Sequence, residues 1–292
     1  MLISTAHAAT ELRPGILAAP DSGMVLTMHP GGGIDALSIT DGQVLWHSTA
    51  ADKPLLARQG QLLGQVDAVA DGMLELAILE ITDGRVSEKS SLPLPAGVRA
   101  AVDDGLGTRF NLGLRGEGQK LTLGWDHSKR VVQGMMSANR PDPKRTSGGL
   151  SVDLASAQFE AVDAAAVPKR AGRSPIEGRF LKEQEGRQFI SSDGQHVLVS
   201  EHDAAPGPPR YRWLVYSRDG ALVGSTRSRV SFSPFVVVDG MLLYTTNPVS
   251  YRTEEGTIAA LPRLLRGIDL ATGLEVWTAE IRDTAYRGPY PP

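Results

Sequence analysis

Two short segments of the sequence combine a histidine with carboxylates and could hold a metal ion. They are Trp125-Asp126-His127 and Glu201-His202-Asp203. A metal site needs several nitrogen or oxygen ligands that converge from different strands. Adjacent residues on a strand point to opposite faces of the sheet, so neither segment makes a site alone. The two segments would have to approach each other, and we assign no metal-ligating residue.

Signatures of nucleophilic catalysis and of phosphate binding are not found. No serine stands in a Gly-x-Ser-x-Gly segment, and the histidines show no order typical of a catalytic triad. The chain has no cysteine, which excludes a thiol nucleophile, a thiolate metal site and a disulfide. The run Gly31–Gly33 precedes an apolar segment rather than a helix, so it indicates a tight turn and not a phosphate loop. We therefore assign no catalytic and no cofactor-binding residue.

Composition narrows the class of protein further. The chain has 292 residues, 41% of them hydrophobic and 22% charged, as in ordinary globular proteins rather than disordered ones. Its 30 basic and 33 acidic side chains give a formal charge of -3, which argues against a general nucleic-acid binder. No apolar run approaches the roughly 18 residues that a transmembrane helix needs.

The sequence repeats one structural unit, and the strands of this unit must position any functional residue. An apolar run at 34–39 leads into the turn Thr40-Asp41-Gly42 and a second run that ends in Trp46, and residues 265–277 repeat this order. Glycine supplies the positive φ that short hairpin turns require. Weaker copies occur at 76–86, 150–159 and 211–223. Short β-rich runs precede the hairpins, at 24–28, 61–66, 120–125, 196–200 and 241–244.

The spacing of these units selects the fold. Gly84 follows Gly42 by 42 residues, and four-stranded propeller blades take roughly 40–45 residues. We therefore predict an all-β propeller of four-stranded antiparallel blades, most simply five, with six or seven left open. One propeller domain is expected over residues 15–292, after a flexible segment at 1–14. A polar linker is expected at 164–187, with a short helix at 176–185 as its best helical candidate.

The two best units resemble the repeat of pyrroloquinoline-quinone-like propellers, a quinoprotein and WD-like repeat family. The resemblance implies that the tryptophan packs between neighbouring blades and that the glycine lets the outer hairpin turn. It assigns these structural roles to Gly42, Trp46, Gly273 and Trp277. Family enzymes bind the quinone and Ca²⁺ on the propeller axis, several with a vicinal disulfide that a chain without cysteine cannot form. Non-catalytic members are assembly scaffolds, including a bacterial outer-membrane assembly lipoprotein, and the resemblance favours this role without a cofactor.

Three insertions separate the second and third strands of their units, at 137–149, 203–210 and 247–262. Strands of a blade alternate in direction, so these loops should emerge on one face, which is often the working surface of a repeat protein. Their basic residues could meet an acidic protein partner or be solvated. The candidates for partner binding are Arg140, Lys144, Arg145, Arg210, Arg212 and Arg252.

The expected function is a non-catalytic binding or scaffold protein that contacts a protein partner or complex through this face. The alternative is a small-molecule binder or enzyme with its site in the axial funnel, including a quinone-dependent dehydrogenase.

The two ends of the sequence give weaker indications of the cellular location and of how the first blade is completed. Ala6-His7-Ala8 has the small residues of a signal-peptidase site, but no apolar region precedes it. It is either the tail of an export signal or a frayed terminus, and a periplasmic location is favoured over a cytoplasmic one. The innermost strand of the first blade is expected from Gly15–Ala19 or from Thr284–Arg287, so that the two ends meet.

Overall fold

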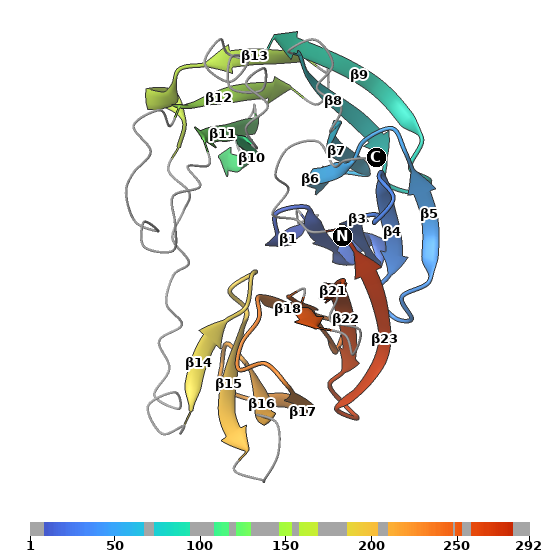
Figure 1. Ribbon diagram of the computed structural model, residues 1–292, viewed down its shortest axis with the longest axis vertical. Coiled ribbons are helices and arrows are strands. Elements are labelled where there is room, and N and C mark those ends of the chain that lie inside the picture. The colour runs from blue at the N-terminus through green and yellow to red at the C-terminus, as the bar shows by residue number, and fades with distance from the viewer. Residues whose placement is uncertain are drawn as a thin grey trace, which may run out of the picture.

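The computed structural model describes ten segments of the chain. They are residues 9–66, 73–93, 108–116, 121–129, 146–153, 158–168, 186–203, 210–247, 249–252 and 258–282. Nearly all of the regular structure in them is β, in five antiparallel sheets of four or more strands and one two-stranded hairpin. We number the five sheets as blades 1 to 5 in chain order (Figure 1).

The blades are built from consecutive strands of the chain. Blade 1 contains β1 (Thr10–Arg13), β2 (Ile16–Ala19), β3 (Met24–Met28), β4 (Ile34–Ser38) and β5 (Val44–Ser48). Blade 2 contains β6 (Lys53–Arg58), β7 (Gln61–Val66), β8 (Met73–Glu80) and β9 (Val86–Pro93). Blade 3 contains β10 (Thr108–Gly116), β11 (Leu121–Lys129), β12 (Thr146–Asp153) and β13 (Gln158–Val162).

The last two blades follow the same plan, with one addition. Blade 4 contains β14 (Arg187–Ile190), β15 (His196–Asp203), β16 (Arg210–Ser217) and β17 (Leu222–Ser228). Blade 5 contains β18 (Phe235–Val238), β19 (Met241–Thr246), β22 (Arg263–Asp269) and β23 (Leu274–Ile281). Between its second and third strands stands a separate hairpin of β20 (Val249–Arg252) and β21 (Ile258–Leu261). The predicted all-β fold of antiparallel blades is confirmed, with five blades in the described residues. Four of them have the predicted four strands, and blade 1 has five.

Neighbouring blades bury their apolar faces against each other. In Figure 1 the blades follow one another in the order 3, 2, 1, 5, 4, so the first and the fifth are neighbours. Separate buried clusters join blades 3 and 2, blades 2 and 1, blades 1 and 5, and blades 5 and 4. The inner strand of blade 5 is therefore apolar throughout, since every residue of Phe235–Val238 in β18 is buried. Among the described residues, no buried cluster joins blade 3 to blade 4.

The prediction of a flexible segment at residues 1–14 is wrong for residues 10–13. Thr10–Arg13 forms β1 on the inner side of β2, because Leu12 is buried in the cluster between blades 1 and 5. The stretch Gly15–Ala19 does enter blade 1, but as its second strand, and Thr284–Arg287 lies outside the described residues. The first and fifth blades also meet through their backbones, since the amide of Arg282 donates to the carbonyl of Met28 at 3.0 Å.

The insertions differ in detail from their predicted bounds. The one placed at 137–149 ends earlier, because residues from Thr146 onward pair with β11 as strand β12. The one at 247–262 is not an irregular loop but contains the hairpin β20–β21. Within the linker predicted at 164–187, Ala164–Ala166 forms the 3₁₀ turn η3 and Arg187 begins β14. The helix expected at 176–185 lies outside the described residues. In the described parts of the chain, no helix is long and apolar enough to span a bilayer.

Candidate functional site

Trp46 and Trp277 lie in equivalent places, each between its own blade and the next. The indole Nε1 of Trp46, in blade 1, donates to the carbonyl of Ile81 in blade 2 at 2.9 Å. The indole Nε1 of Trp277, in blade 5, donates to the carbonyl of Ile39 in blade 1 at 2.8 Å. Both rings are buried. The fifth blade is thus joined to the first in the same way as the first is joined to the second.

Each indole ring lies on a glycine of the neighbouring blade's outer turn. Gly42 has φ +69°, and a Cβ there would lie 2.7 Å from the ring of Trp277. Gly84 has φ +68°, and a Cβ there would lie 2.5 Å from the ring of Trp46. Glycine is therefore required for the left-handed backbone and also for the close approach of the ring.

The junction of blades 4 and 5 places its tryptophan differently. Trp213 of β16 is fully buried and lies edge to face with Tyr244 of β19, with ring centroids 4.9 Å apart. Gly224 of β17 approaches blade 5 so closely that a Cβ there would lie 2.2 Å from the carbonyl oxygen of Leu270. The hydroxyl of Thr226 donates to the carbonyl of Gly273 at 2.8 Å. Gly273 itself has φ +71° in the outer turn of blade 5. Close backbone contact therefore joins these two blades in addition to the ring of Trp213.

The predicted partner-binding residues fall into two groups. Arg140, Lys144 and Arg145 lie outside the described residues, and so does the side chain of Arg252, whose backbone belongs to β20. Arg210 and Arg212 lie on β16, and both are exposed.

The register of blade 4 brings further arginines beside them. Arg212 lies opposite Glu201 on one side and opposite Arg227 on the other, and Arg210 lies opposite Asp203. Arg229 follows directly after β17, and Arg227 and Arg229 are both exposed. We call these four residues the arginine edge: Arg210, Arg212, Arg227 and Arg229. Like charges directly opposite on neighbouring strands destabilise a sheet, so the facing pair on β16 and β17 is unfavourable for the isolated chain.

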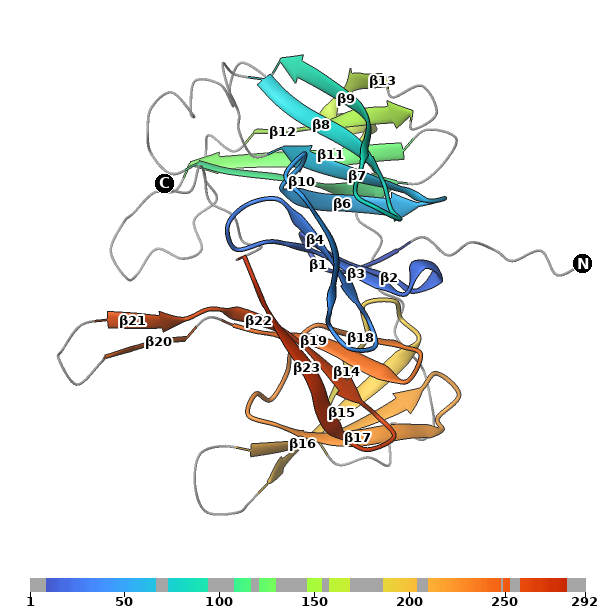
Figure 2. The ribbon, with the colours of Figure 1, turned by 90° about the vertical axis from the view of Figure 1, so that its right-hand side faces the viewer.

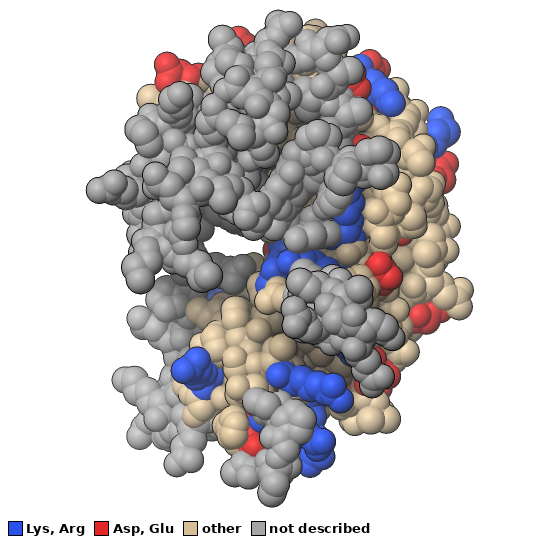
Figure 3. All heavy atoms as spheres, viewed as in Figure 1, with Lys and Arg blue, Asp and Glu red and all other residues tan. Residues whose placement is uncertain are grey.

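The arginine edge belongs to the end of blade 4 where β15 stops and β16 begins. The hairpin β20–β21 leaves blade 5 at the corresponding connection and projects from the molecule on that side (Figure 2). On the face seen in Figure 3, Lys and Arg side chains lie over the lower part of the molecule, where blades 4 and 5 lie, and also near its middle and at its upper right. Phe232, in the connection between these blades, is 39% exposed and stacks on Phe189 at 4.0 Å between ring centroids. Basic and aromatic side chains are therefore near one another on this side.

The two histidine segments singled out in the sequence are not brought together by the described residues. They belong to different blades, β11 in blade 3 and β15 in blade 4. The side chains of Asp126 and His127 lie outside the described part, and His202 packs against Tyr211 at 5.5 Å between ring centroids.

The structure instead gathers a different set of possible ligands in blade 1, namely His29, Asp35 and His47. Two imidazoles do not fit Ca²⁺, which takes oxygen ligands. Among the described residues this group therefore does not match the calcium and quinone centre that the family resemblance implies for its enzymes.

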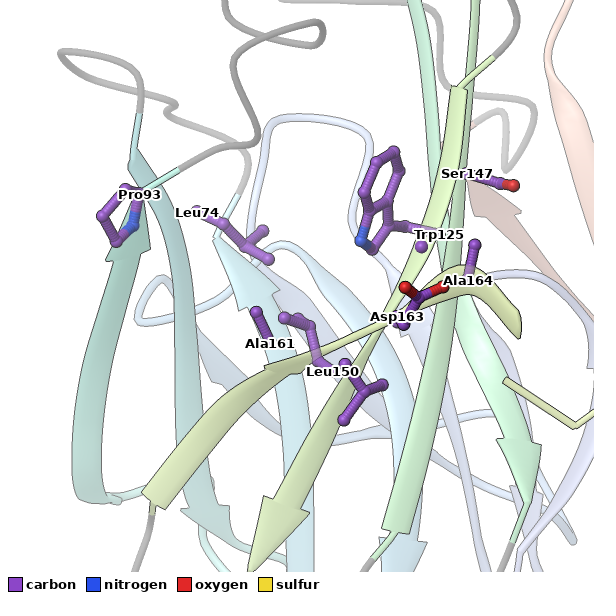
Figure 4. Close-up of a pocket in the computed structure, with 11 residues that line it drawn as sticks. Leu74, Pro93, Trp125, Ser147, Leu150, Ala161, Asp163 and Ala164 are labelled. Carbon is purple, nitrogen blue, oxygen red and sulfur yellow. The ribbon is translucent and has the colours of Figure 1, made fainter. Parts of the chain in front are cut away.

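An apolar pocket of about 600 Å³ lies between blades 2 and 3 (Figure 4). Leu74 and Pro93 line it from blade 2, and Trp125 and Leu150 line it from blade 3. Its carboxylate, Asp163, accepts the amide hydrogen of Ala165 at 2.9 Å and so caps the turn η3. The pocket suits an apolar group, but its described lining offers no acid–base pair.

Comparisons with known proteins concern the architecture. No model of a protein family matches the chain. No curated protein matches it either. The solved structures similar to it include Kuenenia stuttgartiensis hydrazine synthase, at 10% identity and TM-score 0.33, which covers 67% of this chain and 50% of that one. The Dos1 propeller is similar at 8% identity and TM-score 0.29, covering 97% of this chain and 59% of that one.

A europium-containing methanol dehydrogenase is similar at 14% identity and TM-score 0.25, covering 91% of this chain and 68% of that one. The chain thus spans about half the length of the hydrazine synthase chain and 59% of the Dos1 propeller chain. At these identities and TM-scores, the similarities assign neither an activity nor a partner to the chain.

Proposed function

We propose that this protein is a non-catalytic propeller module that binds a protein partner with an acidic surface. The contact is made by the face from which the hairpin β20–β21 projects, with the arginine edge of blade 4 at its centre. The observation that carries the proposal is the exposed cross-strand pair of Arg212 and Arg227, with Arg210 and Arg229 beside it.

The charge of this edge supports an acidic partner. Its four arginines stand beside Glu201 and Asp203 in a chain whose formal charge is -3. Because acidic residues outnumber basic ones in the chain, a locally basic surface arises only where the fold brings basic side chains together. Carboxylates of a partner would relieve the repulsion between the facing guanidinium groups and could bind them in bidentate geometry.

The neighbouring features suit a protein surface better than a small ligand. Arginine and aromatic residues are enriched at the centres of protein interfaces, and Phe232 is exposed near this edge. The hairpin β20–β21 pairs only with itself in the described residues, so it extends from blade 5 without adding to the sheet. Such an extension increases the area that a partner can contact.

The test compares charge reversal at the arginine edge with charge reversal on outer turns away from it. The double variant Arg212→Glu/Arg227→Glu should lose capture of its partner from the native source, and the partner is then identified and titrated in purified form. The matched control is Arg218→Glu/Arg85→Glu, which reverses two exposed arginines on outer turns away from this edge. The control should bind as the wild type does, and binding by the wild type should weaken as salt rises.

Equal affinity of the purified partner for the wild type and the Arg212→Glu/Arg227→Glu variant would refute the proposal. Reduction of a dye with alcohols by the purified protein, after addition of quinone and Ca²⁺, would favour the enzymatic alternative.

A further inference from the structure

Three side chains that can bind transition metals meet at one end of blade 1. His29 directly follows β3, Asp35 lies in β4 and His47 lies in β5. Asp35 and His47 are directly opposite each other in the β4–β5 register. One possible ligand atom from each of the three side chains lies within 4.8 Å of the others. The cluster is separate from the arginine edge, which belongs to blade 4.

The buried carboxylate of Asp35 orients the imidazole of His47. Nδ1 of His47 lies 2.7 Å from Oδ1 of Asp35, and Asp35 is 7% exposed. A carboxylate accepts hydrogen bonds only, so His47 donates from Nδ1 and keeps its lone pair on Nε2. This is the arrangement by which carboxylates support metal-binding histidines in proteins.

The turn between β3 and β4 holds the second imidazole close to the first. The amide of Gly31 donates to Nδ1 of His29 at 3.0 Å, and the amide of Gly33 donates to Oδ1 of Asp52 at 2.9 Å. The rings of His29 and His47 lie edge to face, with centroids 4.8 Å apart. A Cβ on Gly33 would lie 2.9 Å from Cε1 of His47, so only glycine leaves room for this ring.

We propose that His29 and His47 bind a divalent transition-metal ion such as Zn²⁺, with Asp35 as the residue that positions His47. Imidazole nitrogen suits zinc, copper and nickel, whereas magnesium and calcium prefer oxygen. Zinc–nitrogen distances of about 2.0–2.1 Å place tetrahedral ligands about 3.3 Å apart. The ligand atoms of the cluster lie within 4.8 Å of one another, so binding draws His29 toward His47 while Asp35 keeps its hydrogen bond to His47. On binding, the metal takes the Nε2 lone pair of His47 and the Nδ1 lone pair of His29, which releases the amide of Gly31 to water. Water completes the coordination of the metal.

The experiment is calorimetric titration of Zn²⁺ into the untagged protein, with Mg²⁺ in a parallel run. The wild type should bind a single Zn²⁺ and no Mg²⁺, and Zn²⁺ should raise its melting temperature. His47→Ala and His29→Ala should each lose this binding, and Asp35→Asn should bind about 10–100-fold more weakly. The control His202→Ala, which removes an exposed histidine from blade 4, should bind as the wild type does.

His47 is exposed, so its alanine variant should fold, and far-UV circular dichroism checks this. X-ray absorption at the zinc edge should show two imidazole ligands in the wild type. The proposal is overturned if the wild type binds no Zn²⁺ at millimolar concentration, or if the folded His47→Ala variant keeps wild-type affinity.

Discussion

Trp277 contributes to the junction of blades 5 and 1 in two separable ways. Its ring fills the space over Gly42, and its N–H satisfies the carbonyl of Ile39. Trp277→Ala removes both and should destabilise the protein by about 3–5 kcal/mol. Trp277→Phe keeps most of the ring but leaves the carbonyl without its donor, which should cost about 1–3 kcal/mol. Urea denaturation measures both, and Val276→Ala, at an exposed neighbour, should change little.

Gly42 allows the left-handed conformation and the close approach of the ring to be separated. Gly42→Ala and Gly23→Ala both place a Cβ on a left-handed residue, which costs about 1–2 kcal/mol. A Cβ on Gly23 meets nothing within 4 Å, whereas one on Gly42 would clash with the ring of Trp277. Gly42→Ala should therefore lose about 1–3 kcal/mol more than Gly23→Ala. An equal decrease in the melting temperature of the two variants would show that the ring of Trp277 does not restrict this turn.

His196 should make the stability of blade 4 depend on pH. Burial lowers the pKa of His196 because the charged imidazole loses hydration, and the carboxylate of Asp193 opposes this in part. Its Nδ1 is buried and has no hydrogen-bond partner among the described residues. An unfolded histidine binds its proton near pH 6.5, and the folded one only at lower pH. The unfolded state therefore binds more protons in this window, and stability should fall as the pH drops below about 6.5.

Unfolding of wild type and His196→Gln at about pH 7.5 and about pH 5.5 tests this, and the variant should lose part of the pH dependence. His202→Gln, at an exposed position, should keep it.

At the scale of elements, β17 owes its contact with blade 5 to the missing side chain of Gly224. Gly224→Ala would place a Cβ 2.2 Å from the carbonyl of Leu270 and should push the two blades apart. Gly113→Ala, also within a strand, would meet only the end of the Arg115 side chain at 3.3 Å. We expect the first variant to lose about 1–3 kcal/mol and the second much less, as measured by thermal melting. An unchanged melting temperature of the Gly224→Ala variant would mean that the two blades can move apart without loss of stability.

The strands that were predicted correctly are those with a strong local signal. Apolar runs that lead into turns with Gly42, Gly84, Gly220 and Gly273 all became hairpins. The strand β1 was missed because Thr10–Arg13 contains a single apolar residue, Leu12, whose burial depends on contact with the distant blade 5. Tertiary contact of this kind leaves no periodic pattern in a four-residue segment.

Site residues were harder to predict than strands because they depend on register. The pairing of Arg212 with Arg227 follows from how β16 and β17 align, and a bulge between Val215 and Tyr216 shifts that alignment. Counting outward from the hairpin turn would not have paired Asp35 with His47 either, because a bulge between Ala36 and Leu37 shifts this register too. The approach of His29 depends in addition on the folded turn at Gly31–Gly33.

At the scale of the whole molecule, the junction of blades 5 and 1 should couple regions distant in sequence. Trp277→Ala should speed amide hydrogen exchange in blades 1 and 5 while blade 3 stays protected, because stability differs between cooperative units. Trp46→Ala should instead affect blades 1 and 2. Mass spectrometry of the exchanged peptides distinguishes these patterns. Exchange that rises equally in all five blades would indicate one cooperative unit.

The contact between Trp277 and Ile39 spans 238 residues of sequence, and this separation matters while the chain is being made. At about 5–20 residues per second, a ribosome needs about 10–50 s to synthesise the interval. During that time one apolar side of the first blade has no partner, although its other side can already pack on the second. The nascent chain therefore exposes apolar surface until its last strands have been synthesised. We expect chaperones to bind this surface during synthesis.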